Sequence, residues 1–389
     1  MKEVYLDNNA TTKMDEKVFE EMRPYFCDLY GNPSSMHFFG GQVQKKVDEA
    51  RNRAAALIGA HPEEIIFTSC GTESNNTALR SALEVFPEKR HIITTRVEHP
   101  AVLTVCRNLG NRGYRVTELG VDGEGRLDLD ELKNALDEDT AIVSIMHANN
   151  ETGVIFPIEE IGAVVKEKGA LFHTDAVQAV GKIPMDMSRS TVDMLSLSGH
   201  KLHAPKGIGA LYLRRGVPFR PFMVGGHQEK NRRAGTENTA SIIALGRACE
   251  VAGQFMDDEN TRVRSMRDRL EKELLAHIPN ARINGGKAER LPNTLSIAFE
   301  FVEGEAILLL LSELGICASS GSACTSGSLE PSHVLRAMGV PFTCAHGSIR
   351  FSLSRFNREE DVDLVVRELP PIIRRLREMS PFGREYLSA

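Results

Sequence analysis

The sequence predicts an α/β protein, in which helices cover both faces of a mainly parallel sheet and a smaller α+β unit is attached. Its 389 residues exceed what one ordinary hydrophobic core accommodates, so two packed units are expected. Hydrophobic residues make up 41% of the chain and charged residues 26%, which is the usage of a globular protein. Short β-rich runs alternate with helical stretches from residue 64 to about residue 213, an order typical of parallel sheets.

The elements of this sheet can be placed in order along the chain. The β-rich runs lie at residues 65–68, 92–95, 141–145, 170–173 and 195–197. Between them, residues 75–83 and 158–168 carry apolar positions at helical spacing. Ligands of such sheets bind beyond the carboxyl ends of the strands, so polar residues that follow the strands are candidates for function.

A smaller α+β unit is expected after residue 257. A helix that begins near Thr239 leads into a highly charged segment, residues 257–275, with no strand pattern between them. Beyond it we expect strands at 295–301 and 349–353, helices at 305–314 and from 358 onward, and an irregular Ser/Gly stretch at 319–328. Pro370 and Pro371 should interrupt or kink the last helix, because proline lacks a backbone donor and clashes with the preceding turn.

Charge and composition exclude several classes of protein. The net charge of −6 and the pI near 6.1 give no basic field for a polyanion, so nucleic acid is not expected as a partner. The first twelve residues lack a basic stretch followed by an apolar run, and the longest apolar run, residues 306–311, is too short to span a bilayer. We therefore expect a cytoplasmic protein without a membrane partner. Its seven scattered cysteines contain no C-x-x-C pair and indicate neither a disulfide framework nor a zinc ribbon.

The run from Ser69 to Ser74 lies between a predicted strand and a predicted helix. Gly71 and Thr72 at such a helix start would offer backbone N–H groups and a hydroxyl to a phosphate. An ordinary helix cap at Thr72 or Ser74 explains the same residues, and taken alone it is the stronger interpretation.

Two further motifs follow strands. Asp175 lies two residues after the run at 170–173, where a carboxylate is costly to bury and should have a cationic partner, although a structural ion pair or a helix cap would explain it equally well. Ser198, Gly199, His200 and Lys201 follow the run at 195–197. A desolvated lysine can bond to a carbonyl group, whereas a single loop lysine is normally only solvated.

One cofactor requires all three motifs together. An aldehyde needs an amine, a ring nitrogen needs a carboxylate, and a phosphate needs a helix start, and pyridoxal phosphate carries all three groups. His99, after the run at 92–95, could cover the ring and move protons, although a lone histidine is more often a cap or a core residue.

Two residues of the second unit complete the candidate site. Cys324 lies in a run of small residues, 318–328, which predicts a mobile loop carrying a thiol; a surface linker with an incidental cysteine is the simpler alternative. Arg350 lies inside a strand pattern, where it could bind a substrate carboxylate through two hydrogen bonds or form a structural salt bridge.

With these residues in place, the chain resembles the cysteine desulfurase family, which belongs to class V of the aminotransferase-like pyridoxal enzymes. The amino-acid sequences of the Cys324 loop and of residues 369–373, near the C-terminus, are most similar to the nitrogen-fixation type, called NifS. The resemblance runs through nearly the whole chain and rests on residues 5–12, 31–35, 148–151, 198–201, 233–238 and the Cys324 loop.

The resemblance implies a fold and a set of roles. It implies the type I fold of pyridoxal-phosphate-dependent transferases, with a seven-stranded sheet in a large domain of residues 16–256 and a small domain of residues 1–15 and 257–389. In the cofactor site, it assigns the bond to the cofactor to Lys201, the ring nitrogen to Asp175, the ring hydroxyl to Gln178 and ring stacking to His99. It assigns the cofactor phosphate to Gly71, Thr72, Ser198 and His200, with Thr236 from the other subunit of a homodimer. It assigns the substrate carboxylate to Asn150 and Arg350, and the persulfide to Cys324.

The activity implied is the conversion of L-cysteine to L-alanine, with the sulfur passing through Cys324 to an iron–sulfur scaffold or another acceptor protein. The iron–sulfur clusters of nitrogenase are one destination that the resemblance implies for this sulfur. No metal ligand is implied, apart from a transient contact of Cys324 with an iron–sulfur cluster. A selenocysteine lyase or a class V aminotransferase would share Lys201, Asp175 and Arg350, and only the Cys324 loop separates them. A non-enzymatic sulfur-relay protein leaves the Lys201 motif unexplained, and a nucleotide-binding enzyme lacks the third glycine and the helix after Gly209.

Overall fold

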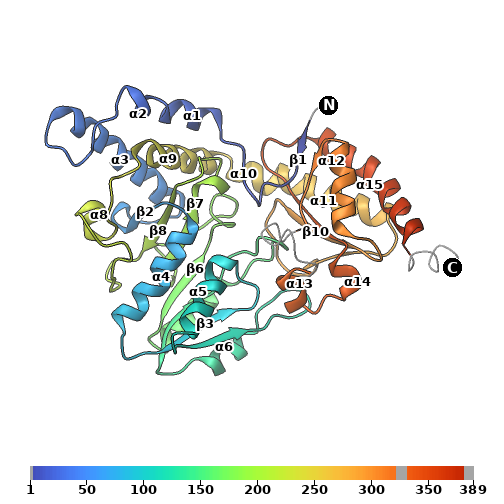
Figure 1. The fold of residues 1–389 in the computed structure, drawn as a ribbon, viewed down its shortest axis with the longest axis horizontal. Helices are drawn as coiled ribbons and strands as arrows, with labels where there is room; N and C mark the ends of the chain where they lie inside the picture. Colours follow the sequence, from blue (N-terminus) through green and yellow to red (C-terminus); the bar gives the residue numbers. More distant parts are fainter. Residues whose placement is uncertain (1–2, 321–330, 381–389) are drawn as a thin grey trace.

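A computed structural model describes residues 3–320 and 331–380 of the chain as two bodies side by side (Figure 1). The larger body is built on a seven-stranded sheet in the order β2-β8-β7-β6-β5-β3-β4. Its strands are β2 (Ile65–Thr68), β3 (His91–Thr95), β4 (Arg115–Leu119), β5 (Thr140–Ser144), β6 (Leu171–Asp175), β7 (Met194–Ser198) and β8 (Gly209–Leu213). Only β8 runs antiparallel to its neighbours, so the expected seven-stranded, mainly parallel sheet is confirmed.

Alternate residues of the strands pack into two different cores, which shows that both faces of this sheet are covered. Ile66 and Ile142 pack with α4 (Gly71–Val85) and α5 (Pro100–Gly110). Ile65 and Val143 point the other way, toward α3 (Phe38–Leu57), α7 (Ile158–Glu167) and α9 (Thr239–Gln254). Shorter helices complete this body, namely α1 (Glu16–Met22), α2 (Pro24–Cys27), η1 (Pro62–Glu64), α6 (Leu129–Ala135), η2 (Gly199–Lys201) and α8 (Gln228–Asn231).

The smaller body contains two short sheets. One is the antiparallel sheet β12-β10-β9, and the other pairs β1 with β11 in parallel. Their strands are β1 (Val4–Tyr5), β9 (Ala281–Ile283), β10 (Thr294–Phe299), β11 (Ile316–Cys317) and β12 (Ser348–Ser352). The helices are α10 (Met256–Asp258), the π-helical turn η3 (Glu259–Val263), α11 (Arg264–His277), α12 (Gly304–Glu313), α13 (His333–Ala337), α14 (Phe342–Ala345) and α15 (Glu359–Met379).

The two bodies have separate hydrophobic cores. Leu6 packs with residues from Val263 to Ile373, whereas Leu335 of α13 and Ala345 of α14 pack into the core of the larger body. The division expected at residues 15 and 257 stays a prediction. In the two described ranges, no helix combines the length and the apolar character that crossing a membrane requires.

The last helix differs from expectation. Helix α15 runs through Pro370 and Pro371 as one helix, so the interruption predicted from these residues does not occur. Its buried side chains recur every three to four residues, among them Val365, Leu369 and Ile373, and pack into the core of the smaller body. Burial of this apolar stripe outweighs the two backbone hydrogen bonds that the prolines remove.

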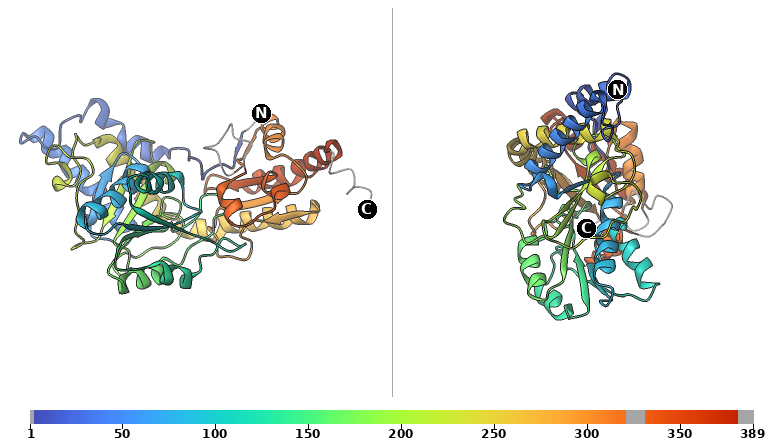
Figure 2. Two further views of the ribbon diagram at one scale, coloured as in Figure 1. Left: turned by 60° about the horizontal axis from the view of Figure 1, so that its bottom comes forward. Right: turned by 90° about the vertical axis from the view of Figure 1, so that its left-hand side faces the viewer.

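The segment from Asp7 to Thr12 links the two bodies. Asn8 Nδ2 donates to the carbonyl oxygen of Ser352 at 2.9 Å, and Asn9 Nδ2 donates to Thr294 Oγ1 at 2.9 Å, both in the smaller body. Thr12 Oγ1 donates to the carbonyl oxygen of His200 at 2.9 Å, in the larger body. This crossing carries the N-terminal segment past the carboxyl ends of β6 and β7 (Figures 1 and 2).

Candidate active site

A cavity of about 340 Å³ lies where the carboxyl ends of β6 and β7 meet the start of α4, and β12 contributes to its wall. We call it the main pocket. All the site residues predicted from the sequence line it except Thr236 and Cys324, which places Gly71, Thr72, His99, Asn150, Asp175, Gln178, Ser198, His200, Lys201 and Arg350 around one space. Cys324 lies outside the described residues.

Helix α4 begins at the pocket wall with free backbone donors. Cys70 is its N-cap and makes no capping hydrogen bond through its side chain, so the cap expected at Thr72 or Ser74 is wrong. Ser74 instead lies buried beside Thr68, with 2.8 Å between their hydroxyl oxygens. A Cβ on Gly71 would lie 2.8 Å from Val177 Cγ2, so only glycine lets the helix start this close to the turn after β6. The first turn of a helix has N–H groups without helical partners, which suits an anion.

Asp175 ends β6 and is 7% exposed. Its two oxygens are held separately: Asn75 Nδ2 donates to Oδ2 at 2.7 Å, and the backbone N–H of Val177 donates to Oδ1 at 3.0 Å. The cationic partner that we expected is not in direct contact with Asp175 in the described part of the chain, because amide donors already satisfy the carboxylate. The carboxylate is therefore fixed in position with its charge directed to the pocket.

Lys201 follows β7 and its amine is held by the N-terminal segment. Nζ donates to the carbonyl oxygens of Asn9 and Ala10, the second at 2.7 Å. Burial lowers the pKa of Lys201 to about 7, helped by the charges of Lys182 and Arg350 and opposed by Asp7 and Asp175. A large share of this amine is thus neutral near neutral pH and can act as a nucleophile or a base.

Two histidines of the pocket are neutral. His99 caps α5, and its Nδ1 accepts the backbone N–H of Ala101 at 3.1 Å, which leaves the ring proton on Nε2. Burial lowers the pKa of His99 below its ordinary value. Burial and the nearby Lys201 lower the pKa of His200 to about 4, and His200 Nδ1 lies 3.2 Å from Thr11 Oγ1.

Gln178 and Ser198 complete the end of the pocket that contains Asp175 and Lys201. The amide of Gln178 is oriented at both atoms: Nε2 donates to the carbonyl oxygen of Asn9 at 3.0 Å, and Oε1 accepts from Lys182 Nζ at 3.0 Å. Ser198 is the buried last residue of β7.

The opposite wall carries Arg350 and Asn150. Arg350 Nη2 donates to Asp7 Oδ1 at 2.6 Å, and Nη1 donates to the carbonyl oxygen of Asn150 at 2.9 Å. Arg350 lines the pocket, where it could bind a substrate carboxylate, and it also forms a salt bridge with Asp7. The structure is therefore compatible with both interpretations of this residue. Beside it, Ser332 Oγ donates to the buried carboxylate of Glu151, whose pKa is raised by burial.

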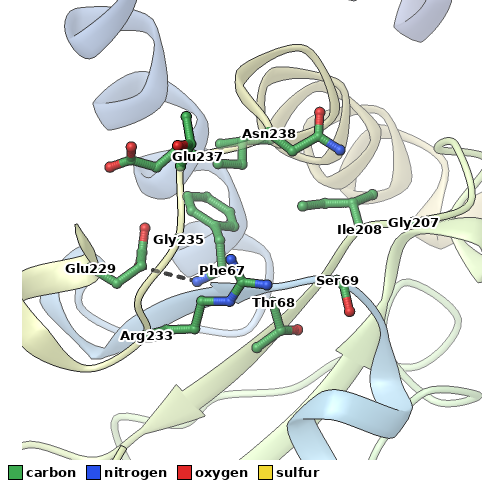
Figure 3. A pocket seen from close by; sticks show the side chains of 12 residues that line it. Phe67, Thr68, Ser69, Gly207, Ile208, Glu229, Arg233, Gly235, Glu237 and Asn238 are labelled. Carbon is green, nitrogen blue, oxygen red and sulfur yellow. Dashed lines mark hydrogen bonds between the residues drawn. The ribbon is translucent and has the colours of Figure 1, made fainter. Parts of the chain in front are cut away.

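Thr236 lies elsewhere. It is exposed and lines a second cavity of about 150 Å³, together with Ser69, Gly207 and Arg233 (Figure 3). In this cavity Arg233 Nε donates to Glu73 Oε1 at 2.8 Å, and the carboxylate of Glu229 accepts the backbone N–H of Phe67 at 3.1 Å. Within the described part of a single chain, Thr236 does not reach the main pocket.

Several residues of the site were not predicted. Asn9 and Ala10 act through backbone carbonyl oxygens, which leave no signal in a side-chain pattern. Asn75 and Lys182 act on Asp175 and Gln178 from buried positions. An amide on an otherwise apolar helix face was the one available signal for Asn75.

The residues of the main pocket fit pyridoxal phosphate. The pocket offers an amine of lowered pKa, a fixed carboxylate and a helix start, as the aldehyde, ring nitrogen and phosphate of the cofactor require. Asn75 Oδ1 is buried without a hydrogen-bond partner among the described residues, so the polar groups around Asp175 are not saturated by the protein alone.

The comparisons with known proteins agree with this geometry. The family model described as aminotransferase class-V matches residues 4–365. A cysteine desulfurase of Trichormus azollae is 62% identical over 99% of this chain and 96% of its own, and the cysteine desulfurase NifS of Azotobacter vinelandii is 59% identical over 98% and 95%. A solved NifS-like protein is 42% identical with a TM-score of 0.90, covering 96% of this chain and 100% of that one. The solved NifS-like protein of Rickettsia africae is 32% identical with a TM-score of 0.85, covering 95% and 99%.

Family membership follows from two independent facts: a match along nearly the full length of both chains, and a pocket whose amine, carboxylate and helix start suit one cofactor. The chain belongs to the cysteine desulfurase family of pyridoxal-phosphate-dependent class-V aminotransferases.

Proposed function

We propose that the chain is a cysteine desulfurase, which releases L-alanine from L-cysteine and transfers the sulfur to Cys324. The observation that carries the proposal is the convergence of Lys201, Asp175, Arg350 and the start of α4 on one cavity. The 62% identity with a cysteine desulfurase over almost the whole chain supports it.

Pyridoxal phosphate supplies an electron sink for the charge that develops at the substrate Cα. Asp175 would support this chemistry, because its fixed carboxylate would hold the ring nitrogen of the cofactor. Lys201 would hold the aldehyde of the cofactor, and its Nζ would move the substrate Cα proton, since its lowered pKa leaves the amine partly neutral. His99 is neutral and holds a proton at Nε2 for transfer near the ring.

Arg350 and Asn150 orient the substrate carboxylate, and Asp7 gives up its hydrogen bond to Arg350 when the substrate binds. The Cys324 thiolate attacks the substrate sulfur, so that the C–S bond breaks, an S–S bond forms, and the carbon gains a proton to give alanine. Cysteine and the enzyme thiol thus become alanine and an enzyme persulfide, with atoms and electrons balanced.

The proposal extends to partners and location. A homodimer would let the exposed Thr236 of one subunit reach the phosphate site of the other. The persulfide would pass its sulfur to an iron–sulfur scaffold or another acceptor in the cytoplasm, and nitrogenase cofactor assembly is one such destination in view of the similarity to NifS.

The test is a measurement of alanine and sulfide released by the purified, cofactor-loaded protein with L-cysteine and a reducing thiol. Lys201→Ala should lower the rate at least 10³-fold, because the amine serves as both attachment and base. Cys324→Ala should retain cofactor absorbance but stop sulfide release, whereas the matched Cys27→Ala, at an exposed cysteine, should change neither. Full activity of Cys324→Ala would refute the assignment of the nucleophile, and selenide formed faster than sulfide would favour a selenocysteine lyase.

A further inference from the structure

A second buried lysine lies behind the catalytic one. Lys182 is 7% exposed and does not line the main pocket. Its Nζ donates to Gln178 Oε1 at 3.0 Å. Burial of an ammonium group costs free energy, and apolar packing does not offset this cost. The presence of a lysine at this position therefore points to a role for its charge or its hydrogen bonds.

Hydrogen bonds connect the two lysines. Lys182 holds Gln178 Oε1, Gln178 Nε2 donates to the carbonyl oxygen of Asn9, and the same oxygen accepts from Lys201 Nζ. Lys182 and Lys201 also line one small cavity of about 20 Å³, which has room for a single water molecule. The two side chains therefore share an enclosed space and one chain of polar contacts.

Glu259 supplies the charge that balances Lys182. It is buried in η3, lines the same small cavity, and its Oε2 has no hydrogen-bond partner within residues 3–320 and 331–380. Burial lowers the pKa of Lys182 to about 8, and Glu259 opposes this shift. Burial also raises the pKa of Glu259 to about 7, opposed first by Lys182. Lys182 thus keeps most of its charge at neutral pH in this pairing.

We infer that Lys182 is a positioning residue for the proposed reaction: its charge, maintained by Glu259, keeps Lys201 deprotonated, and its hydrogen bond orients Gln178. The inference rests on the proposed function only for the role of Lys201. The same small cavity is also lined by His203 and Arg355. The charged or titratable groups that face Lys201 are Lys182, Arg350, Asp7, Asp175, His99 and His200.

The electrostatic reason is direct. Like charges disfavour each other in a buried space, so an ammonium at Lys182 favours the neutral amine at Lys201. Among the groups that act on Lys201, Lys182 is the largest cause of its lowered pKa after burial itself. Replacement of Lys182 by an apolar residue should therefore return the proton to Lys201.

The experiment measures protonation of Lys201 without any catalytic turnover. The full chain, stripped of cofactor, is treated with acetic anhydride from about pH 5.5 to about pH 9.5, and acetylation of Lys201 is quantified by mass spectrometry against the exposed Lys45. In Lys182→Met the midpoint for Lys201 should rise by about one pH unit, which makes labelling at pH 7 about fivefold slower.

Two further variants separate charge from packing. Glu259→Gln should raise the Lys201 midpoint as well, because Lys182 then loses its proton more readily and repels less. Lys182→Arg keeps the charge and should leave the midpoint low. A raised midpoint in Lys182→Arg would assign the effect to packing, and an unchanged midpoint in both Lys182→Met and Glu259→Gln would overturn the inference. Because labelling needs no desulfuration, failure of the proposed function would leave this result intact, and the reverse also holds.

Discussion

The two ends of the main pocket are built differently. At the cofactor end, amide donors that no ligand needs to displace fix Asp175, and backbone carbonyl oxygens hold the amine of Lys201. At the substrate end, Arg350 is occupied by the carboxylate of Asp7, which is the same kind of group that the substrate would present. The cofactor end is thus preorganised, whereas binding at the substrate end requires one carboxylate to be exchanged for another.

This difference has its origin in the fold. The cofactor end stands on the parallel strands β6 and β7 in the middle of the large sheet. The substrate end is assembled from Arg350 on β12 of the smaller body and from Asp7, at the start of the segment that crosses between the bodies.

The largest effect that tests the comparison is expected at Arg350. Lysine cannot donate two parallel hydrogen bonds to a carboxylate, so Arg350→Lys should raise KM for L-cysteine about 10- to 100-fold with little loss of bound cofactor. Steady-state kinetics and the absorbance of the bound cofactor measure the two quantities. Arg269→Lys, at a surface ion pair of α11 with Glu359, is the matched control and should change neither. Equal loss of cofactor in Arg350→Lys would mean that the two ends are not independent.

A smaller effect of the opposite kind is expected at Asn75. Asn75→Leu removes the side-chain donor to Asp175, so cofactor affinity should fall about tenfold while KM for cysteine in the loaded protein changes little. Equilibrium dialysis of pyridoxal phosphate gives the affinity. Asn76→Leu changes the neighbouring amide, which bonds within α4 instead, and serves as the control. An unaltered affinity in Asn75→Leu would show that Val177 alone fixes Asp175.

A third expected effect concerns stability and its dependence on pH, not binding. Burial raises the pKa of Glu98, beside His99, to about 8 from 4.5. Since the folded-state pKa is raised, the stabilisation is complete below about pH 4.5 and is lost progressively as pH rises toward 8. Glu98→Gln should flatten this slope in urea unfolding at several pH values, while Glu88→Gln, at an exposed position, should retain it. A slope that survives in Glu98→Gln would assign the titration to another group.

The sequence predicted the strands that carry the site, because these leave strong local patterns, whereas the roles of several pocket residues came only from the family resemblance. Edge strand β4 was missed since its residues are partly exposed and charged, and β8 was not singled out because it begins at a glycine-rich turn. The interruption expected as one outcome at Pro370 and Pro371 does not occur, because packing of α15 overrides local preference. The support for Lys201 could not be foreseen, because it joins residues 192 positions apart through a backbone oxygen.

The crossing segment has a practical consequence for handling this protein. The oxygens that hold the amine of Lys201 belong to residues 9 and 10, and the neighbouring Leu6 is buried in the smaller body. A chain shortened by ten residues would therefore lose β1 and Leu6 from the smaller body as well as the oxygens that hold the reactive amine, and a bulky tag fused close to β1 would disturb the same segment. Affinity handles are better placed after α15, the last described helix, which lies far from β6 and β7 in Figure 1.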